Sequence, residues 1–359
     1  MATQIVAVLN QKGGVGKTTT CVSLGAALAR RGQEVLLVDM DPQANLTVHV
    51  GVDPRSVERS TYTLLLGRHD LASAIRPTST VGLSVVPSTL ALANAEIQLA
   101  SAVGRELILR EALDVYLGPQ PSPKADFVII DCPPSLGILT MNALCASTDV
   151  LLPLQAEFFA LQGVAGILES LKAVQRLNRA LKLSWVLPCM VDRRKTLARD
   201  VLEEVRRYFG NLVVQTMIRP NVKLAEAPSH GMTIFEYDPS SNGAKDYAAL
   251  AGELLGEIAP PPDDEEETAE TPVAADAAPE EAVPVEAAAE APPSGISYPP
   301  DMERELRAAA DESEPPPLPD APPVIDESPP PATRIETTES ESAPADEVAS
   351  ADSERPWNG

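Results

Sequence analysis

Two alternating patterns of apolar residues run through the first 259 positions of the chain. Uninterrupted apolar runs, typical of strands buried on both faces of a parallel sheet, lie at residues 5–9, 35–38, 127–130, 149–154 and 184–190. Between them, apolar residues recur every three or four positions, as in amphipathic helices, at residues 22–28, 90–102, 106–117, 158–177, 196–209 and 246–258. This alternation predicts an α/β fold in which a doubly wound, mostly parallel sheet is flanked by helices.

A few segments carry weaker patterns. Residues 82–87 and 212–218 are each apolar enough for a further strand, and residues 63–67 and 71–75 predict short helices. Residues 48–80 as a whole show no sustained period, so we expect them to form an excursion on the surface.

The composition of the chain changes near residue 259. Residues 260–359 hold 27 of the 52 acidic residues and four of the 28 basic ones, and so carry −23 of the net charge of −24. This segment, rich in proline, alanine and glutamate, has few large apolar residues and buries too little surface to offset its ordering entropy. We therefore predict one folded domain over residues 1–259 and a disordered acidic tail over residues 260–359, with a candidate short helix at residues 301–311.

A glycine-rich turn with two lysines joins the first predicted strand to the first predicted helix. It reads K-G-G-V-G-K-T-T from Lys12 to Thr19, and its strand–turn–helix context is that of a phosphate-binding P-loop, although Gln11 stands where the common pattern has glycine. Lys17 can reach the β- and γ-phosphates of a nucleotide, and the Thr18 hydroxyl can ligate Mg²⁺. The backbone N–H groups and the helix N-terminus would bind the phosphates. The predicted nucleotide-binding residues of the turn are Gly13, Gly14, Val15, Gly16, Lys17, Thr18 and Thr19.

Acidic residues follow two of the predicted strands, at the sheet edge where open α/β sheets bind ligands. Asp39 and Asp41 follow the strand at 35–38, and a solvated acidic loop is the alternative explanation for them. Asp131 ends the strand at 127–130 in the manner of a Walker B carboxylate, and would meet the Mg²⁺ shell directly or through water. Residues 132–137 then predict a switch, because their backbone would lie beside the γ-phosphate.

Four motifs together resemble one family. They are NQKGGVGKTT, DMDPQANLT, DCPPSLG and EAPSHG, and they lie within roughly residues 1–258. With them the chain is similar to the ParA/Soj branch of the ParA/MinD class, P-loop ATPases with a deviant Walker A box. The resemblance implies a Mg²⁺-dependent ATPase, with ATP and Mg²⁺ as cofactors, that forms a homodimer on ATP.

The resemblance also implies roles for single residues, and makes Lys12, Lys17 and Asp41 the candidate catalytic residues. Lys12 would reach the nucleotide of the partner subunit, where a cation supplied in trans offsets charge on the transferring phosphoryl group. Asp41 would position the attacking water, and Asp39 would join Thr18 and Asp131 around the magnesium ion. The nucleotide-binding residues near the base would be Met190, Asp192 and Pro228.

Basic residues of the predicted domain gather in two clusters. One holds Arg193, Arg194 and Lys195, with further arginines on the helix that follows, and the other holds Arg219 and Lys223. No aromatic residues are interleaved with them, so any binding of double-stranded DNA would be dominated by phosphate contacts, non-specific and salt-dependent. A solvated helical face explains these residues as well as DNA does, and the resemblance, whose members bind DNA with this half of the domain, favours DNA.

Three functions follow from these observations, and we predict the first. It is a DNA-partitioning ATPase that binds DNA as an ATP dimer and is released when a ParB-type centromere-binding protein stimulates hydrolysis. A MinD-like membrane-positioning ATPase would need a basic amphipathic C-terminal helix, whereas the C-terminal segment is acidic. A metabolic enzyme on the same scaffold would be a ligase or an iron–sulfur reductase component.

The cysteines and the apolar runs bear on these alternatives and on where the protein works. The four cysteines lack the spacing of a metal cluster, which disfavours the reductase. They are Cys21, Cys132, Cys145 and Cys189. No secretory signal or apolar run of 18 residues is visible, so we expect a cytoplasmic, nucleoid-associated protein with no membrane contact.

Overall fold

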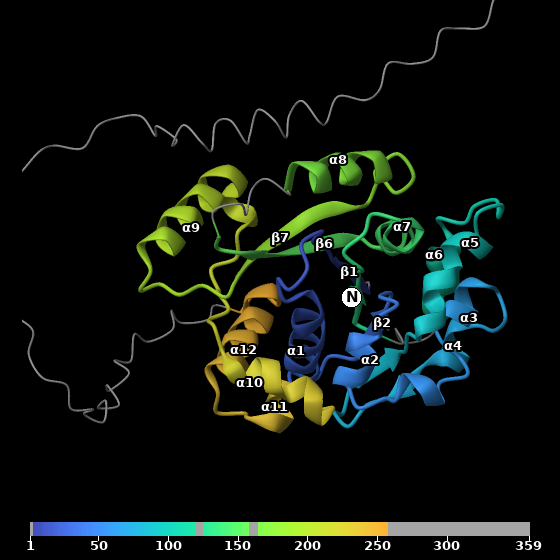
Figure 1. Ribbon diagram of the computed structural model, residues 1–359, viewed down its shortest axis with the longest axis horizontal. Helices are drawn as coiled ribbons and strands as arrows, with labels where there is room; N and C mark the ends of the chain where they lie inside the picture. Colours follow the sequence, from blue (N-terminus) through green and yellow to red (C-terminus); the bar gives the residue numbers. More distant parts are fainter. Residues whose placement is uncertain (1–2, 119–124, 158–163, 258–359) are drawn as a thin grey trace, which may run out of the picture. The chain divides into compact units, whose positions relative to one another are not determined.

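The fold is a seven-stranded sheet with helices on both faces, seen in a computed structural model that describes residues 3–118, 125–157 and 164–257 (Figure 1). The strand order is β3-β4-β2-β5-β1-β6-β7, and every neighbouring pair is parallel except β3 with β4. This confirms the predicted doubly wound, mostly parallel α/β sheet. The strands are β1 (Gln4–Val8), β2 (Val35–Asp39), β3 (Arg76–Pro77), β4 (Leu83–Val86), β5 (Phe127–Asp131), β6 (Asp149–Gln155) and β7 (Lys182–Cys189).

The side chains of each strand alternate between two hydrophobic layers, because successive residues of a strand point to opposite faces. On β1, Ile5 and Ala7 join one layer and Val6 and Val8 join the other. The first layer is covered by α3 (Thr61–Leu65), α4 (Leu71–Ala74), α5 (Ala95–Gln98), α6 (Ile108–Leu117), α7 (Ile138–Ala146), α8 (Val164–Val174) and α9 (Thr196–Phe209). The second is covered by α1 (Lys17–Ala29), α2 (Asn45–His49), α10 (Val222–Glu226), α11 (Ile234–Tyr237) and α12 (Asn242–Leu254). Four 3₁₀ turns complete the described elements: η1 (Pro54–Ser56), η2 (Leu90–Asn94), η3 (Gly210–Leu212) and η4 (Ala227–His230).

Helix α1 is buried on nearly all sides, because it packs between the sheet and α12. Its small residues allow close approach, and a Cβ placed on Gly25 would lie 2.9 Å from a methyl group of Leu37 on β2. On the other side, the Thr20 and Tyr247 hydroxyl groups are 3.0 Å apart, within hydrogen-bond distance. The helix that begins at the glycine-rich turn is therefore held rigidly in the core.

The second layer contains one backbone-to-backbone contact between distant segments. Gly51 follows α2 and Gly231 follows η4, both with positive φ, and a Cβ on Gly231 would lie 2.9 Å from the Cα of Gly51. A side chain at Gly231 would therefore push α2 and η4 apart.

The predicted strand at residues 212–218 is wrong, and the cause lies in α12. Only two isolated pairs reach β7, Val213 with Val186 and Ile218 with Cys189. Between them, the backbone N–H groups of Gln215 and Thr216 donate to the Glu253 carboxylate at 2.6 and 2.9 Å. Because a side chain takes these donors, the ladder to β7 is interrupted.

Other boundaries differ less. The predicted helix at 90–102 begins as η2 and continues only as α5, and the helix predicted at 246–258 begins earlier, at Asn242. Of the helix predicted at 158–177, α8 covers 164–174, and residues 158–163 lie outside the described part. The boundary at residue 259, the acidic tail and the candidate helix at 301–311 also lie outside it. Within the described ranges, every helix is too short or too polar to span a bilayer.

His49 is a buried titratable residue in α2. Its side chain is 1% exposed, and neither ring nitrogen has a hydrogen-bond partner in the part of the chain that the structure describes. Burial lowers the pKa of His49 from 6.5 to about 4, because the core disfavours the charged imidazolium. The folded state therefore binds the His49 proton more weakly than the unfolded state does.

We predict that His49 makes the protein less stable as the pH falls. Between pH 7 and pH 5 the unfolded state takes up a proton that the folded state refuses, so about 2 kcal/mol of unfolding free energy is lost. Chemical denaturation at both pH values measures this loss, and His49→Phe should abolish that part of it. The substitution His230→Gln, at an exposed histidine, provides the control. An unchanged slope in His49→Phe would contradict the assignment.

Candidate active site

The glycine-rich turn leaves the carboxyl end of β1, in the middle of the sheet, and leads into α1. Gly14 and Gly16 adopt φ values of 76° and 93°, which L side chains rarely tolerate. Gly16 is the N-cap of α1, and no side chain caps the helix. Nothing would crowd a Cβ on Gly13, Gly14 or Gly16, so there is open space around this part of the turn. The first N–H groups of a 13-residue helix are thus available to an anion.

The two lysines of the turn occupy different environments. Lys17 is buried, and its Nζ donates to the Lys12 carbonyl at 3.1 Å, so its ammonium group lies along the turn. Lys12 is half exposed, and its ammonium group forms an ion pair with the Glu157 carboxylate just after β6. Lys17 is thus placed to act within its own subunit, whereas Lys12 lies at the surface.

Asn10 braces the start of the turn, a role that the sequence did not reveal. Its side-chain amide donates to the Pro153 carbonyl on β6 at 2.7 Å, and its side-chain oxygen accepts from the Lys12 N–H at 3.0 Å. The residue thereby fixes the turn to the neighbouring strand. An asparagine directly after a predicted strand was the only available signal, and it is a weak one.

The structure brings Thr18 and Asp131 together, and their predicted role as magnesium ligands stays a prediction. The Thr18 hydroxyl donates to Asp131 Oδ2 at 2.7 Å, and Asp131 is fully buried at the end of β5. The other oxygen, Asp131 Oδ1, has no hydrogen-bond partner among the described residues. A hydroxyl and an orphaned carboxylate oxygen are both hard oxygen ligands, so these two residues fit Mg²⁺.

Asp39 lies opposite Asp131 in the register of β2 with β5, and it is also fully buried. Burial, together with the repulsion between these neighbouring carboxylates, raises the pKa of Asp131, and burial raises the pKa of Asp39 as well. Because two negative charges in this position are unfavourable on their own, the end of the sheet favours a cation.

The side chain of Asp39 is held by protein groups, which the sequence did not reveal. Oδ2 accepts from the N–H and hydroxyl of Thr47 at 2.9 and 2.6 Å, and Oδ1 accepts from the Asp41 N–H at 3.1 Å. Thr47 Oγ1 in turn accepts from the Ser88 N–H at 2.8 Å. Asp39 therefore organises the loop that carries Asp41. Its predicted place around the metal stays a prediction.

Asp41 is nearly buried at the start of that loop. Its Oδ1 accepts from the Gln43 N–H at 2.9 Å, as in an Asx turn, and its carbonyl accepts from the Ser88 hydroxyl at 2.8 Å. These bonds fix the carboxylate at the same sheet edge as Asp131. The alternative, a solvated acidic loop with an Asx turn, is right about the turn at Asp41 but not about solvation, since Asp39 and Asp41 are 0% and 9% exposed.

The predicted switch at residues 132–137 lies between β5 and α7. The Cys132 N–H donates to the Val8 carbonyl at 3.3 Å, and the Thr140 hydroxyl donates to the Ser135 carbonyl. Glu96 of α5 lies against Gly137, where a Cβ would meet its carboxylate. The segment is thus adjacent to the glycine-rich turn through β1.

The three residues predicted near the base lie on two segments. Met190 follows β7 with φ of 54°, an uncommon value for a side chain with a Cβ, and is partly exposed. Asp192, two residues on, accepts from the Arg194 N–H at 3.2 Å and from its Nε at 3.0 Å. Pro228 lies in η4, which packs against α2.

The two basic clusters are brought side by side by the pairing of Cys189 with Ile218 and by the Val191 N–H, which donates to the Ile218 carbonyl. The members differ in how they are held. Arg219 forms an ion pair of 2.7 Å with the nearly buried Asp246, and Lys223 pairs with Glu226 at 2.9 Å and lies over the Tyr237 ring. Lys195 precedes α9 and is exposed.

Comparison with known proteins gives one family. Residues 3–183 match the family model described as an AAA domain. The chain is 47% identical over 252 residues to the sporulation initiation inhibitor protein Soj of Bacillus subtilis, an alignment covering 70% of this chain and 98% of Soj. It is 42% identical over 258 residues to the chromosome partitioning protein ParA of Myxococcus xanthus, covering 72% and 89% of the two chains.

A solved structure gives the same fold under another name. The cobyrinic acid a,c-diamide synthase of Mycobacterium smegmatis with bound ADP and magnesium is 40% identical, with a TM-score of 0.61. The alignment covers 70% of this chain and 94% of that one.

The bonds of Thr47 lead to a prediction about stability. Thr47→Val keeps the shape of the side chain but removes the hydroxyl, so Asp39 loses a donor and the Ser88 N–H loses its acceptor. Buried polar groups left unpaired cost roughly 1–3 kcal/mol, and we expect the free energy of unfolding to fall by about that amount. Thr47→Ser retains the hydroxyl and should lose less than half as much in chemical denaturation. Equal losses in the two variants would assign the effect to packing instead.

Proposed function

The chain belongs to the ParA/Soj family of chromosome-partitioning P-loop ATPases, and from this premise we propose that it is an ATP-dependent DNA-partitioning enzyme. In this proposal it hydrolyses ATP with Mg²⁺, dimerises on ATP and binds DNA without sequence specificity. The observation that carries it is the site at the ends of β1, β2 and β5, where Thr18, in the first turn of a helix whose N-terminus no side chain caps, donates to the buried Asp131.

Each residue of the site has a place in this proposal. The N–H groups of α1 and the Lys17 ammonium hold the β- and γ-phosphates, and Thr18 and Asp131 hold Mg²⁺. Bound Mg²⁺ neutralises charge on the phosphate oxygens. Asp41 orients the attacking water, and Asp39 keeps the loop of Asp41 in place through Thr47. Met190, Asp192 and Pro228 are proposed to lie around the base.

Lys12 is proposed to act on the nucleotide of the partner subunit. In the single chain its ammonium group is paired with Glu157 at the surface, and both side chains are about half exposed. Exposed ion pairs contribute only about 0–1 kcal/mol, so Glu157 binds Lys12 weakly and phosphate oxygens can replace it as the partner of Lys12. The pair keeps Lys12 close to the turn without preventing its transfer.

DNA binding is proposed for the adjoining basic clusters, with Arg193, Arg194, Lys195 and Lys223 as contacts. Arg219 belongs to the proposed set too, although the hydrogen bonds that its guanidinium group donates to Asp246 also give it a structural role. A ParB-type partner is proposed to stimulate hydrolysis and release the protein from the nucleoid in the cytoplasm.

The membrane-positioning alternative keeps the lysine pair but has less support. The last described helix, α12, carries one lysine against one aspartate and one glutamate, so it is not the basic helix that anionic lipid would attract. ATP-dependent co-sedimentation with anionic vesicles would favour this alternative.

A second candidate function is suggested by the name of the Mycobacterium smegmatis structure. A diamide synthase makes amide bonds, and one that takes its nitrogen from glutamine through a cysteine nucleophile needs a reactive thiolate. All four cysteines are buried, and burial raises the pKa of Cys21, Cys132, Cys145 and Cys189, so none is an accessible nucleophile. ATPase activity stimulated by a carboxylate substrate with ammonia, and not by DNA, would favour the synthase.

We predict that Lys12→Ala abolishes ATP-dependent dimerisation. With a non-cleavable ATP analogue, the unmodified protein should become a dimer by light scattering, and the variant should remain a monomer because the charge supplied in trans is missing. Its affinity for random-sequence DNA should fall to the nucleotide-free level at moderate salt. Lys245→Ala on the exposed side of α12 is the matched control and should behave as the unmodified protein. A monomeric unmodified protein under these conditions would refute the proposal.

We predict that Asp41→Ala separates DNA binding from turnover. The variant should still bind ATP and DNA, because it keeps the phosphate-binding turn and Lys12. Steady-state phosphate release should fall by about two orders of magnitude or more, as expected when a water-positioning group is lost. Single-turnover hydrolysis and DNA dissociation measure the two effects, and release from DNA at the normal rate would contradict the role.

A further inference from the structure

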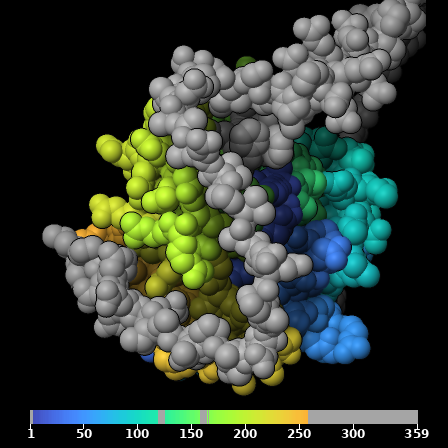
Figure 2. All heavy atoms as spheres, turned by 60° about the vertical axis from the view of Figure 1, so that its left-hand side comes forward, coloured from blue at the N-terminus to red at the C-terminus, as the bar shows by residue number. Residues whose placement is uncertain are grey.

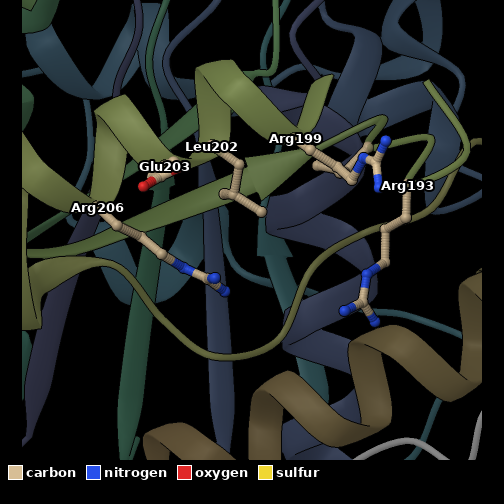
Figure 3. A pocket seen from close by; sticks show the side chains of 6 residues that line it. Arg193, Arg199, Leu202, Glu203 and Arg206 are labelled. Atoms are coloured by element: carbon tan, nitrogen blue, oxygen red, sulfur yellow. The ribbon is translucent and has the colours of Figure 1, made fainter. Parts of the chain in front are cut away.

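A hollow with a cavity volume of about 280 Å³ lies beside α9. We call it the α9 hollow; its lining residues are Val191, Arg193, Arg199, Leu202, Glu203 and Arg206. Figure 2, turned so that this side comes forward, shows the residues of α9 in yellow-green on the surface. In Figure 3, Arg206 extends from the left of the view toward its centre and Arg193 extends downward on the right, so the two side chains lie on opposite sides of the hollow.

The charge of the α9 hollow is positive, with three arginines against one glutamate. Arg199, Glu203 and Arg206 are spaced four and three residues apart on α9, so they share one exposed face. The opposite face of the helix packs on the sheet through Val201, Val205 and Phe209. Arg199 donates to the Thr196 hydroxyl at 3.3 Å, and no ion pair to Arg199 or Arg206 is formed by the residues that the structure describes.

The floor of the α9 hollow is apolar. Val191 and Leu202 are 2% and 7% exposed, so the guanidinium groups stand at the rim of a shallow hydrophobic depression. This arrangement suits a flexible chain with carboxylates that reach the rim and methylene groups that cover the floor. Planar guanidinium groups bind carboxylates with two parallel hydrogen bonds, which makes them good partners for aspartate and glutamate.

The chain itself supplies such a segment close by. Residues 263–267 read DDEEE, and the first of them is six residues beyond Glu257, a reach of about 20 Å. Glu257 is placed by its ion pair with Arg31 at 3.2 Å. Glu253, four residues earlier, holds the N–H groups of Gln215 and Thr216, directly after α9 and η3. The end of α12 therefore lies beside the segment that follows α9 and η3.

We propose that the α9 hollow is a docking site for the protein's own acidic C-terminal segment, with residues 263–267 as the part that binds. The segment beyond residue 259 holds 27 acidic residues against four arginines, whereas residues 1–259 are nearly neutral. Each ion pair at a surface is weak, but a tethered segment has an effective concentration on the order of millimolar. Weak contacts are then sufficient for substantial occupancy at low salt.

The docked segment would regulate the DNA-binding surface, a consequence that rests on the proposed function. Arg193 belongs both to the lining of the α9 hollow and to the proposed DNA contacts, so carboxylates and DNA phosphates would compete for its guanidinium group. DNA, with one charge per about 1.7 Å of helix axis, wins when an ATP dimer presents two such surfaces together. The segment would thus weaken DNA binding by single subunits more than by dimers.

Direct docking is tested with a fluorescein-labelled peptide of residues 258–290 added to a protein of residues 1–257. That protein includes every described element, and Soj, which aligns over 98% of its length with 252 residues of this chain, has a comparable size. At about 50 mM salt, fluorescence anisotropy should show binding that weakens about ten-fold in Arg199→Gln/Arg206→Gln, as expected for the loss of two charges. Arg176→Gln/Arg179→Gln, on exposed residues near the end of α8, is the matched control and should bind within two-fold of the unmodified protein.

The regulation is tested in the full chain by changing residues 263–267 to NNQQQ. Without nucleotide at low salt, this variant should bind random-sequence DNA about five-fold tighter than the unmodified chain. The difference should be smaller with a non-cleavable ATP analogue and should vanish at about 0.5 M salt. The control changes five acidic residues near the end of the chain instead: Glu341, Asp346, Glu347, Asp352 and Glu354. Equal tightening in the control would mean a general charge effect and would overturn the assignment to residues 263–267.

The outcomes of the two experiments are distinguishable. A peptide that does not bind, or that binds equally to Arg199→Gln/Arg206→Gln, overturns docking at the α9 hollow whatever DNA does. Displacement of the peptide by inorganic phosphate at micromolar concentration would identify a phosphate site and overturn the acidic segment as its occupant. A protein that binds the peptide but never binds DNA refutes the proposed function and leaves the docking site established.

Discussion

The burial of two carboxylates side by side is the constraint on which the site depends. The register of β2 with β5 places Asp39 opposite Asp131 at the centre of the sheet, where water cannot screen their charges. The protein compensates one of them with the bonds of Thr47 and Asp41, and the other with the Thr18 hydroxyl and the charge of Lys17. The remaining negative charge of Asp131 favours a cation at the end of β5. The N-terminus of α1 beside it favours an anion.

The parts of this site that are local in the sequence could be predicted from it. The glycine-rich turn, the lysines and the acid at the end of an apolar run lie within short segments whose pattern implies a strand, a turn and a helix. The bonds that hold these parts could not be predicted, because Thr47 reaches Ser88 and Asn10 reaches Pro153, across 41 and 143 positions. Such contacts depend on the order of strands in the sheet, and an apolar pattern does not specify that order.

The strand predicted at residues 212–218 does not form because a side chain takes the place of its backbone hydrogen-bond partners. Residues 212–218 have the composition of a strand, yet Glu253 takes two of the N–H groups that a strand would give to β7. The isolated pair of Cys189 with Ile218 and the bond from the Val191 N–H to the Ile218 carbonyl bring residues 190–195 next to Arg219. The two basic clusters meet at this incomplete edge of the sheet. A continuous eighth strand would have buried its polar groups in the ladder and kept the two clusters in a more regular arrangement.

The contact between Gly51 and Gly231 has a mechanical consequence. The main chains at Gly51 and Gly231 are in contact with no side chains between them. No flexible group can therefore absorb a displacement, and the segments that contain α2 and η4 are expected to move together. One of these segments begins a few residues after Asp41, and the other follows Lys223 by less than ten positions. A tilt of α2, the short helix between Asp41 and Gly51, would therefore displace η4 directly, without intermediate side chains.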